Sequence, residues 1–267
     1  MPRLDCGGDR MKDSYDASIY GERISSKYDE WYGSCEESVI NLISEYADGG
    51  SIFELGIGTG RIAIPLAHRG LDVAGIDASK AMVEELKKKP GSESICVQIG
   101  DFSSFSTEKH YDMAFVAFNT FFLLPDQEQQ INCFRSVHRL LSNAGRFLIE
   151  SFVPDPKRFD KGQTVRTVDL NDGSVKLECS RHDTVNQVVT SQIVHISENG
   201  VNLYPVRVRY AWPSEIDLMA RLTGFVLLER WGGWKKEPFS ESSGYHVSVY
   251  QKSVLESFRF SSRKHAD

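Results

Sequence analysis

A glycine-rich segment contains the first residues whose types and spacing could do chemistry. Glu54 is followed by Gly56, Gly58 and Gly60, and the segment lies between an apolar run typical of a strand and a run with helical periodicity. Glycines in such a turn let a ligand approach the backbone, and the start of the next helix offers free N–H groups. The spacing therefore predicts a binding site for a nucleotide-like cofactor.

Two classes of cofactor use a turn of this kind, and spacing and charge distinguish them. A nicotinamide or flavin dinucleotide fits the pattern G-x-G-x-x-G, but Arg61 stands where its third glycine would be. The carboxylate of Glu54 would repel a pyrophosphate and attract a ligand that bears an ammonium and a sulfonium. These features favour S-adenosylmethionine over a dinucleotide.

Two further acids follow predicted strands. Asp77 ends the second strand, where a carboxylate can accept both ribose hydroxyl hydrogens. Asp101 ends the third strand and precedes Phe102, so this pair can bind the adenine amino group and cover the ring. A single aspartate at a strand end is common, but an ordered series of acids beside a glycine turn favours a cofactor site.

The elements that position these residues change in rhythm near residue 153. Up to residue 152, apolar runs alternate with helical segments, which predicts a parallel sheet covered on both faces. The predicted helices span 35–48, 61–68, a segment capped by Ser79, and 127–141, and the strands span 51–55, 71–76, 94–99, 111–118 and 146–152. Beyond it, period-two alternation and turn signals at 171–173 and 198–200 predict about four antiparallel strands. A helix over 214–222 and strands over 225–231 and 246–251 close the chain.

This rhythm predicts an α/β fold, a doubly wound sheet with an antiparallel β insertion. We expect a helical lid over 1–48, a cofactor-binding core over 49–152, an antiparallel cap over 153–212, a closing helix and strand pair over 213–252, and a polar tail over 253–267. The insertion is expected to cap the pocket, to form a homodimer interface, or to do both.

Three motifs carry a family resemblance. Residues 54–60, 75–79 and 100–102 resemble the successive motifs of class I S-adenosylmethionine-dependent methyltransferases, and the similarity covers residues 15–252. It implies a mainly parallel seven-stranded sheet whose last strand is antiparallel. It also implies that Glu54, Gly56, Gly58 and Gly60 line the methionine end of the cofactor, Asp77 the ribose, and Asp101 with Phe102 the adenine. We place Ala78, Met82 and Phe118 in the same cofactor site.

The methyl acceptor should lie over the carboxyl ends of the strands, facing the loop that follows the fourth strand. In that loop Asn119 either contacts the methionine portion or the acceptor, or caps the turn, and Phe118 and Phe121 either wall the pocket or join the core. Tyr20 and Tyr28 resemble a segment that folds over the cofactor in class I enzymes acting on small molecules; ordinary helix packing is the alternative. We take Tyr20, Tyr28 and Asn119 as the candidate catalytic residues, and Tyr28 also as a cofactor contact.

The expected reaction is an in-line displacement on a methyl group, which needs alignment and exclusion of water. An amine need only arrive neutral, whereas an alcohol usually needs a base. His182 and His246 are candidate bases, although a lone strand histidine is more often structural. The insertion resembles the cap of N-methyltransferases that modify amino sugars and lincosamide-type antibiotics; these often carry a histidine after strand four, where this chain has Phe122.

We therefore expect methylation of a small-molecule amine, and O-methylation is the second alternative. A third alternative is a non-catalytic module that binds S-adenosylmethionine, whereas the sequence disfavours a dehydrogenase. A nucleic-acid or protein-glutamine methyltransferase would usually carry Asn-Pro-Pro-Tyr after strand four, and Asn119-Thr120-Phe121 lacks the prolines.

Composition limits the classes of partner and the cellular compartment that we expect. The net charge of −6 from 31 basic and 37 acidic residues disfavours a broadly basic nucleic-acid surface. Five widely spaced cysteines without a C-x-x-C pair fit neither a disulfide framework nor a zinc site. The polar N-terminus lacks the apolar core of a signal peptide, and the run 113–124 is too short to cross a bilayer. We expect a cytoplasmic protein with no membrane, nucleic-acid or metal partner.

Overall fold

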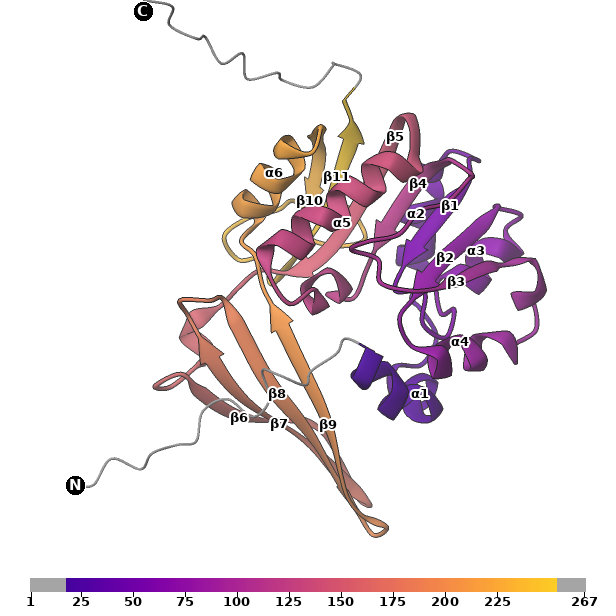
Figure 1. The fold of residues 1–267 in the computed structure, drawn as a ribbon. Coiled ribbons are helices and arrows are strands. Elements are labelled where there is room, and N and C mark those ends of the chain that lie inside the picture. Colours follow the sequence, from indigo (N-terminus) through magenta and orange to yellow (C-terminus); the bar gives the residue numbers. More distant parts are fainter. Residues whose placement is uncertain (1–17, 254–267) are drawn as a thin grey trace, which may run out of the picture.

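A computed structural model describes residues 18–253 and contains two sheets (Figure 1). The seven-stranded sheet has the order β10-β11-β5-β4-β1-β2-β3, and the four-stranded sheet has the order β6-β7-β8-β9. The strands of the large sheet are β1 (Ile52–Leu55), β2 (Val73–Asp77), β3 (Cys96–Ile99), β4 (Tyr111–Val116), β5 (Leu141–Phe152), β10 (Phe225–Trp231) and β11 (Tyr245–Lys252). The predicted α/β fold class is confirmed.

The direction of the strands agrees with the expected topology. Strands β1 to β5 pair in parallel, whereas β11 is antiparallel to both β5 and β10. The carboxyl ends of β1, β2 and β4 therefore meet at one edge of the sheet, where the glycine turn and Asp77 also lie. This edge is where ligands bind in open α/β sheets.

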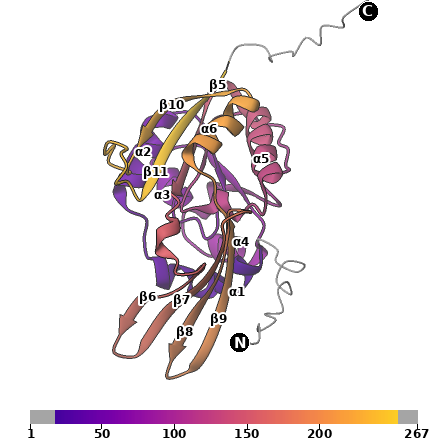
Figure 2. The ribbon, with the colours of Figure 1, turned by 90° about the vertical axis from the view of Figure 1, so that its left-hand side faces the viewer.

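Helices cover both faces of the large sheet (Figures 1 and 2). On one face lie α2 (Glu37–Ala47), α3 (Ala63–His68) and α4 (Lys80–Lys87), and on the other lie α5 (Gln127–Leu140) and α6 (Pro213–Leu222). Phe134 of α5 is fully buried and meets Phe147 and Phe225 edge to face at 5.3 and 5.8 Å between ring centroids. These apolar layers hold the strand ends rigidly in place.

The second sheet, called the cap sheet below, is an insertion between β5 and α6. Its strands are β6 (Gln163–Asn171), β7 (Ser174–Asp183), β8 (Val188–Ser197) and β9 (Gly200–Arg209). Both predicted hairpin turns are present, and each neighbouring pair is antiparallel. The cap sheet extends away from the core, and helix α1 (Ser18–Tyr32) lies between it and α4 (Figure 1).

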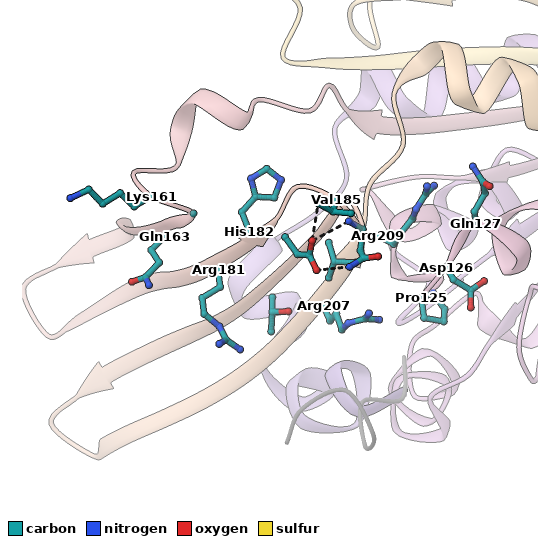
Figure 3. A pocket seen from close by; sticks show the side chains of 15 residues that line it. Pro125, Asp126, Gln127, Lys161, Gln163, Arg181, His182, Val185, Arg207 and Arg209 are labelled. Atoms are coloured by element: carbon teal, nitrogen blue, oxygen red, sulfur yellow. Dashed lines mark hydrogen bonds between the residues drawn. The ribbon is translucent and has the colours of Figure 1, made fainter. Parts of the chain in front are cut away.

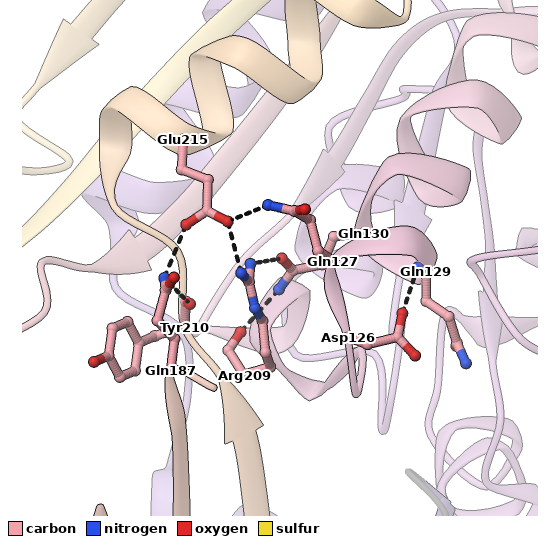
Figure 4. A network of polar contacts seen from close by, with 8 residues as sticks. All are labelled: Asp126, Gln127, Gln129, Gln130, Gln187, Arg209, Tyr210 and Glu215. Atoms are coloured by element: carbon pink, nitrogen blue, oxygen red, sulfur yellow. Dashed lines mark hydrogen bonds and ion pairs between the residues drawn. The ribbon is translucent and has the colours of Figure 1, made fainter. Parts of the chain in front are cut away.

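A buried polar network joins the cap sheet to the core (Figure 4). Arg209, at the end of β9, pairs with Glu215 of α6 at 2.6 Å and donates to the side-chain oxygen of Gln130 in α5 at 2.7 Å. Gln130 returns a hydrogen bond to the Arg209 carbonyl at 2.8 Å. Arg209 is buried, and a buried guanidinium needs this full set of partners. The network therefore fixes how the cap sheet meets α5 and α6.

The boundaries differ from the sequence-based ones mainly around β4 and β5. β4 ends at Val116 rather than residue 118, because Phe118 and Asn119 have left-handed backbones with φ of 56° and 64°. β5 begins at Leu141, five residues early. Most of the expected polar tail lies outside the described residues. Within 18–253 no helix is long and apolar enough to cross a membrane.

Candidate active site

A cavity of about 550 Å³ opens over the carboxyl ends of the central strands, between the large sheet, α1 and the cap sheet. It brings together most of the side chains selected from the sequence. The predicted site residues that line it are Tyr20, Tyr28, Gly56, Gly58, Asp77, Ala78, Met82, Phe102, Phe118 and Asn119.

The glycine turn needs its glycines. Gly56 has φ of +73°, and a Cβ there would lie 2.5 Å from the Cγ2 of Thr120. Gly58 has φ of +54°, and its N–H donates to the Asp77 carboxylate at 2.8 Å. A side chain at Gly56 would both strain the backbone and collide with the strand-four loop. The turn therefore places backbone without side chains against the cavity.

Asp77 is fixed where β2 ends. Its carboxylate accepts from the backbone N–H groups of Gly58 and Ser79, each at 2.8 Å. Ser79 then caps α4 as predicted, since its hydroxyl accepts from the Met82 N–H at 3.2 Å. Burial raises the pKa of Asp77 despite these donors. A carboxylate has about four lone-pair positions, so Asp77 keeps acceptor capacity toward the cavity.

Glu54 lies under the glycine turn, beside a small adjoining cavity that Tyr28, Gly56 and Gly58 also line. It is 5% exposed, and its Oε2 has no hydrogen-bond partner among residues 18–253. Burial, reinforced by the nearby Asp77 carboxylate, raises the pKa of Glu54 well above its usual value. A buried carboxylate with an unpaired oxygen is costly, and a cationic ligand group would relieve that cost.

Helix α1 is clamped over the glycine turn by ionic and polar contacts. Asp29 accepts from the Thr59 hydroxyl at 2.7 Å and pairs with Lys89 at 2.6 Å. Glu22 accepts from the Ser79 hydroxyl at 2.8 Å. These contacts bind α1 to both the turn and the start of α4, so α1 covers the cofactor side of the cavity.

The tyrosines of α1 lie on the cavity side, as expected for residues spaced by about two helical turns. The Tyr20 hydroxyl lies 2.8 Å from the Tyr32 hydroxyl, and the rings of Tyr28 and Tyr32 are 4.7 Å apart. Burial raises the pKa of Tyr28 to about 12. Its hydroxyl is therefore protonated at neutral pH and can donate a hydrogen bond. Residues 1–17 of the expected helical lid lie outside the described residues.

Arg61 is a cavity residue that the sequence reasoning did not select. Its guanidinium lies 5.7 Å from the ring centres of both Tyr28 and Tyr32 and 5.0 Å from that of Phe118. It also donates to the carbonyls of Gly33 and Tyr32, at 2.9 and 3.0 Å. Its position directly after Gly60 was the one feature of the sequence that could have pointed to a role for Arg61 in the site. The contacts with the rings join residues far apart in the chain and are seen only in the folded structure.

The loop after β4 contains Phe118 and Asn119 in the cavity wall, with the next two aromatics turned away. The Asn119 side-chain oxygen accepts from the Phe152 N–H at 2.6 Å, so Asn119 ties this loop to the end of β5. Phe121 is fully buried against Phe134. Of the two alternatives left open by the sequence, Phe121 therefore joins the core, because the 3-10 turn over Thr120–Leu123 directs it there.

Four other candidates do not line the main cavity. Gly60 packs beneath Leu86, and Asp101 is exposed and accepts from the Ser103 N–H at 2.7 Å. His182 lies 2.8 Å from the Tyr210 hydroxyl. His246 is buried next to Ser248, and burial lowers its pKa to about 3. The two histidines are thus placed as structural residues rather than as bases.

The cap sheet closes the cavity with its inner face. Its apolar part consists of Val168, Val189, Ile193, Val206 and Val208, and its polar part consists of Arg166, Glu178 and Ser191. Arg158, in the 3-10 turn over Pro156–Arg158 that precedes β6, lines the cavity beside them. A separate cleft of about 890 Å³ lies on the outer face, where Arg181 and Arg207 flank Thr190 (Figure 3). The outer cleft contains neither the glycine turn nor Asp77, so the inner cavity is the candidate active site.

Comparison with known proteins agrees with this geometry. Residues 52–145, which include the glycine turn and Asp77, match the family model described as a methyltransferase domain. The chain is 37% identical to the CcbJ methyltransferase from Streptomyces caelestis, covering 90% of this chain and 100% of that one with a TM-score of 0.85. The chain belongs to the S-adenosylmethionine-dependent methyltransferases. The resemblance inferred from the sequence motifs is confirmed.

Two other relatives of this methyltransferase cover most of its length. The cypemycin N-terminal methyltransferase of a Streptomyces species is 27% identical over 244 residues, which is 89% of this chain and 99% of that protein. A structure of CalS10 from Micromonospora echinaspora with S-adenosylmethionine bound shares the fold, at 16% identity and a TM-score of 0.65, covering 85% of this chain and 96% of that one.

The site of this methyltransferase fits S-adenosylmethionine, which is the cofactor of the family. The unpaired oxygen of Glu54 suits a cationic group, the bare backbone at Gly56 and Gly58 permits close approach, and Asp77 has spare acceptor capacity. These three features lie around continuous or adjoining cavities. The predicted enzyme class and cofactor are therefore confirmed.

Proposed function

We propose that this enzyme methylates an amine nitrogen of a small molecule. The observation that carries the proposal is the composition of the cavity wall: among the described residues that line it there is no histidine or lysine. An amine acceptor needs no dedicated base beyond arriving neutral, whereas an alcohol usually does. The name of the cypemycin relative, an N-terminal methyltransferase, supports the same choice.

The carboxylate in the cap half of the cavity is a poor candidate for a base. Glu178 is buried, and burial alone would raise its pKa, but the Arg166 guanidinium beside it holds the pKa below its usual value. Glu178 also accepts from the hydroxyls of Ser180 and Ser191, at 3.2 and 3.1 Å. A carboxylate with these donors holds a proton weakly, which favours an amine over an alcohol.

In this proposal the cofactor half of the cavity binds and orients. Glu54, Gly56 and Gly58 hold the methionine end, Asp77 the ribose, and Ala78, Met82 and Phe102 surround the adenosine. Gly60 acts by allowing α3 to pack close to α4, and Asp101 stays a predicted adenine contact from the edge of the site. S-adenosylmethionine supplies a methyl group already activated by its sulfonium.

The residues that face the acceptor align it and exclude water. Tyr28 donates from a protonated hydroxyl, Tyr20 extends that polar face, and Phe118 presents an aromatic wall. Asn119 acts mainly as a positioning residue, because its side-chain oxygen is engaged by Phe152. Alignment of this kind can contribute several kcal/mol to an in-line displacement, on the order of 7–11 at most.

The proposal is tested with methyl-labelled S-adenosylmethionine and matched pairs of small molecules in which an amine replaces an alcohol on the same scaffold. We expect transfer to amines and not to their alcohol partners. Transfer only to alcohols would show an O-methyltransferase. Binding of S-adenosylhomocysteine without transfer to any amine or alcohol would favour a non-catalytic module.

Two further expectations concern the cellular compartment and the oligomeric state. A reducing cytoplasmic setting is supported by the free thiols of Cys35, Cys96, Cys133 and Cys179. A homodimer through the cap sheet stays a prediction, which the mass of the protein in solution would test.

A further inference from the structure

The cap half of the cavity carries a charged cluster that the proposed chemistry does not use. Arg166 of β6 contacts the Glu178 carboxylate across the sheet, and an Arg158 terminal nitrogen lies 4.0 Å from the same carboxylate. All three residues line the cavity. Two guanidiniums therefore face one carboxylate, and the cluster has one positive charge in excess.

The cluster has more hydrogen-bond donors than its one carboxylate uses. Glu178 accepts hydrogen bonds from Arg166, Ser180 and Ser191, so its oxygens already have donors. Arg166 uses only its Nε in the contacts found within residues 18–253, and Arg158 makes its 4.0 Å ion contact and lies 4.7 Å from the Phe159 ring centre. A guanidinium carries five N–H donors, so most of these donors remain available to a ligand.

The surroundings of the cluster are apolar. Val168 of β6, Ile193 of β8 and Val206 of β9 line the same inner face. Ile193 lies directly opposite Glu178 in the pairing of β7 with β8. A ligand that meets the cluster therefore also meets a hydrophobic surface, which suits an apolar body next to an anionic group.

We propose that Arg158 and Arg166 select an acceptor that carries a carboxylate on an apolar scaffold, held at the cap side while its amine faces the cofactor. This rests on the proposed function and specifies its substrate class. Guanidiniums bind carboxylates through parallel N–H···O bonds. The carboxylate would neutralise the excess charge, and Glu178 keeps the two guanidiniums oriented when the site is empty.

The test is a binding experiment that does not need turnover. Cyclohexanecarboxylate and cyclohexanecarboxamide have the same apolar body, and their affinities are measured by titration calorimetry or ligand-observed NMR with S-adenosylhomocysteine at saturation. We expect the carboxylate to bind about tenfold more tightly. Equal binding of the two probes, including no binding of either up to about 10 mM, overturns the proposal.

Variants test whether Arg158 and Arg166 cause the preference for the carboxylate probe. R166Q and R158Q should each lower the carboxylate-to-amide affinity ratio about fivefold or more, and R166Q/E178Q should do so without leaving a buried carboxylate unpaired. R207Q, on the outer face (Figure 3), is the matched control and should keep the ratio. An unchanged ratio in R158Q and R166Q overturns the proposal.

The affinity for S-adenosylhomocysteine distinguishes a failure of this proposal from a failure of the proposed function. We expect it to be unchanged in all these variants. If R158Q and R166Q weaken it as much as they weaken the carboxylate probe, the guanidiniums hold the cofactor's own carboxylate and the proposal is wrong. If the wild-type protein does not bind S-adenosylhomocysteine at all, the proposed function fails first.

Discussion

Gly21 of α1 lies against Ser79 at the start of α4, so closely that a Cβ added to Gly21 would be 2.6 Å from the Ser79 Cβ. The contact leaves room for Glu22 to bond the Ser79 hydroxyl. We predict that Gly21→Ala pushes α1 away from the cofactor side and weakens S-adenosylhomocysteine binding about tenfold, since overpacking costs about 1–3 kcal/mol. Calorimetry measures the change.

The matched control for Gly21→Ala is Ser26→Ala, an exposed position in the same helix. Both changes raise helix propensity, because alanine is the best helix former. Ser26→Ala should keep cofactor affinity. Equal affinity in both variants would show that the close approach of α1 to α4 does not matter for binding.

Glu54 leads to a prediction in which stability and binding change in opposite directions. Its buried carboxylate has an unpaired oxygen and a raised pKa, so the charged form costs free energy in the cofactor-free protein. Glu54→Gln should raise the free energy of unfolding without cofactor by about 1–2 kcal/mol at pH 8 and weaken S-adenosylhomocysteine binding about tenfold or more. Urea denaturation and calorimetry measure the two effects.

Glu84→Gln, on the exposed side of α4, is the control for Glu54→Gln. It should leave both quantities within about 0.5 kcal/mol. Lower stability together with unchanged binding in Glu54→Gln would mean that this carboxylate is structural and does not serve the cofactor.

Asp77 should be needed for binding rather than for folding. Asp77→Ala removes acceptors facing the cavity, and hydrogen bonds to charged groups are worth about 1.5–3 kcal/mol. We expect S-adenosylhomocysteine affinity to fall by about tenfold to a hundredfold with a cooperative melt retained. Asp72→Ala, an exposed residue before β2 that pairs with Lys109, is the control. Unchanged affinity in Asp77→Ala would remove the ribose assignment.

Local signals made much of this fold predictable. The Ser79 cap, the hairpin turns near Asn171 and Asn199, and the glycine turn before α3 depend on residues close together in sequence, whose backbone preferences are strong. The alternation of strands and helices predicted a parallel sheet covered on both faces, but not the order of its strands, which depends on pairing between distant segments. The glycine turn and the Ser79 cap also form much of the cofactor side of the cavity, so the shape of that side was largely predictable.

The acceptor side was less predictable, because its contacts join residues far apart in the chain. The turn that pairs Asn171 with Ser174 would place Arg166 opposite Cys179, on the outer face. An irregularity between Thr167 and Asp169 shifts the register by one residue, so Arg166 faces Glu178 instead. A one-residue shift moves side chains to the other face of a sheet, and the sequence carried no clear signal for it.

The tyrosines of α1 offer a test that separates turnover from stability. Tyr28→Phe removes a buried, protonated hydroxyl from the cavity, and Tyr20→Phe removes the partner of Tyr32. We predict that each lowers kcat about tenfold with an amine acceptor, within the range for lost positioning, and changes the melting temperature by only a few degrees.

Tyr46→Phe should show the reverse pattern. Tyr46 lies outside the cavity, where its hydroxyl bonds Glu229 and accepts from the Trp231 ring N–H at 2.9 Å. Its loss should lower the melting temperature and spare kcat. Normal kcat in both Tyr20→Phe and Tyr28→Phe would remove the tyrosines from the site.

Glu150 gives a pH-dependent prediction. Its buried carboxylate accepts the backbone N–H groups of Phe118 and Asn119, both in left-handed conformations that cost free energy and need support from the surrounding structure. Burial raises the pKa of Glu150 from 4.5 to about 7 despite these donors. The folded state therefore binds the proton more tightly than the unfolded chain, so this group stabilises the fold below pH 4.5 and loses that contribution as the pH rises to about 7.

Comparison with Glu150→Gln isolates this effect, because other buried carboxylates such as Glu54 contribute equally to both proteins. Urea denaturation of each protein between pH 4 and 8 gives the difference in unfolding free energy, wild type minus variant. That difference should fall by up to about 1.4 kcal/mol per pH unit between the two pKa values and stay constant above them. A difference that does not vary with pH would mean that Glu150 is ionised alike in the folded and unfolded states, and that its charge does not control the strand-four loop.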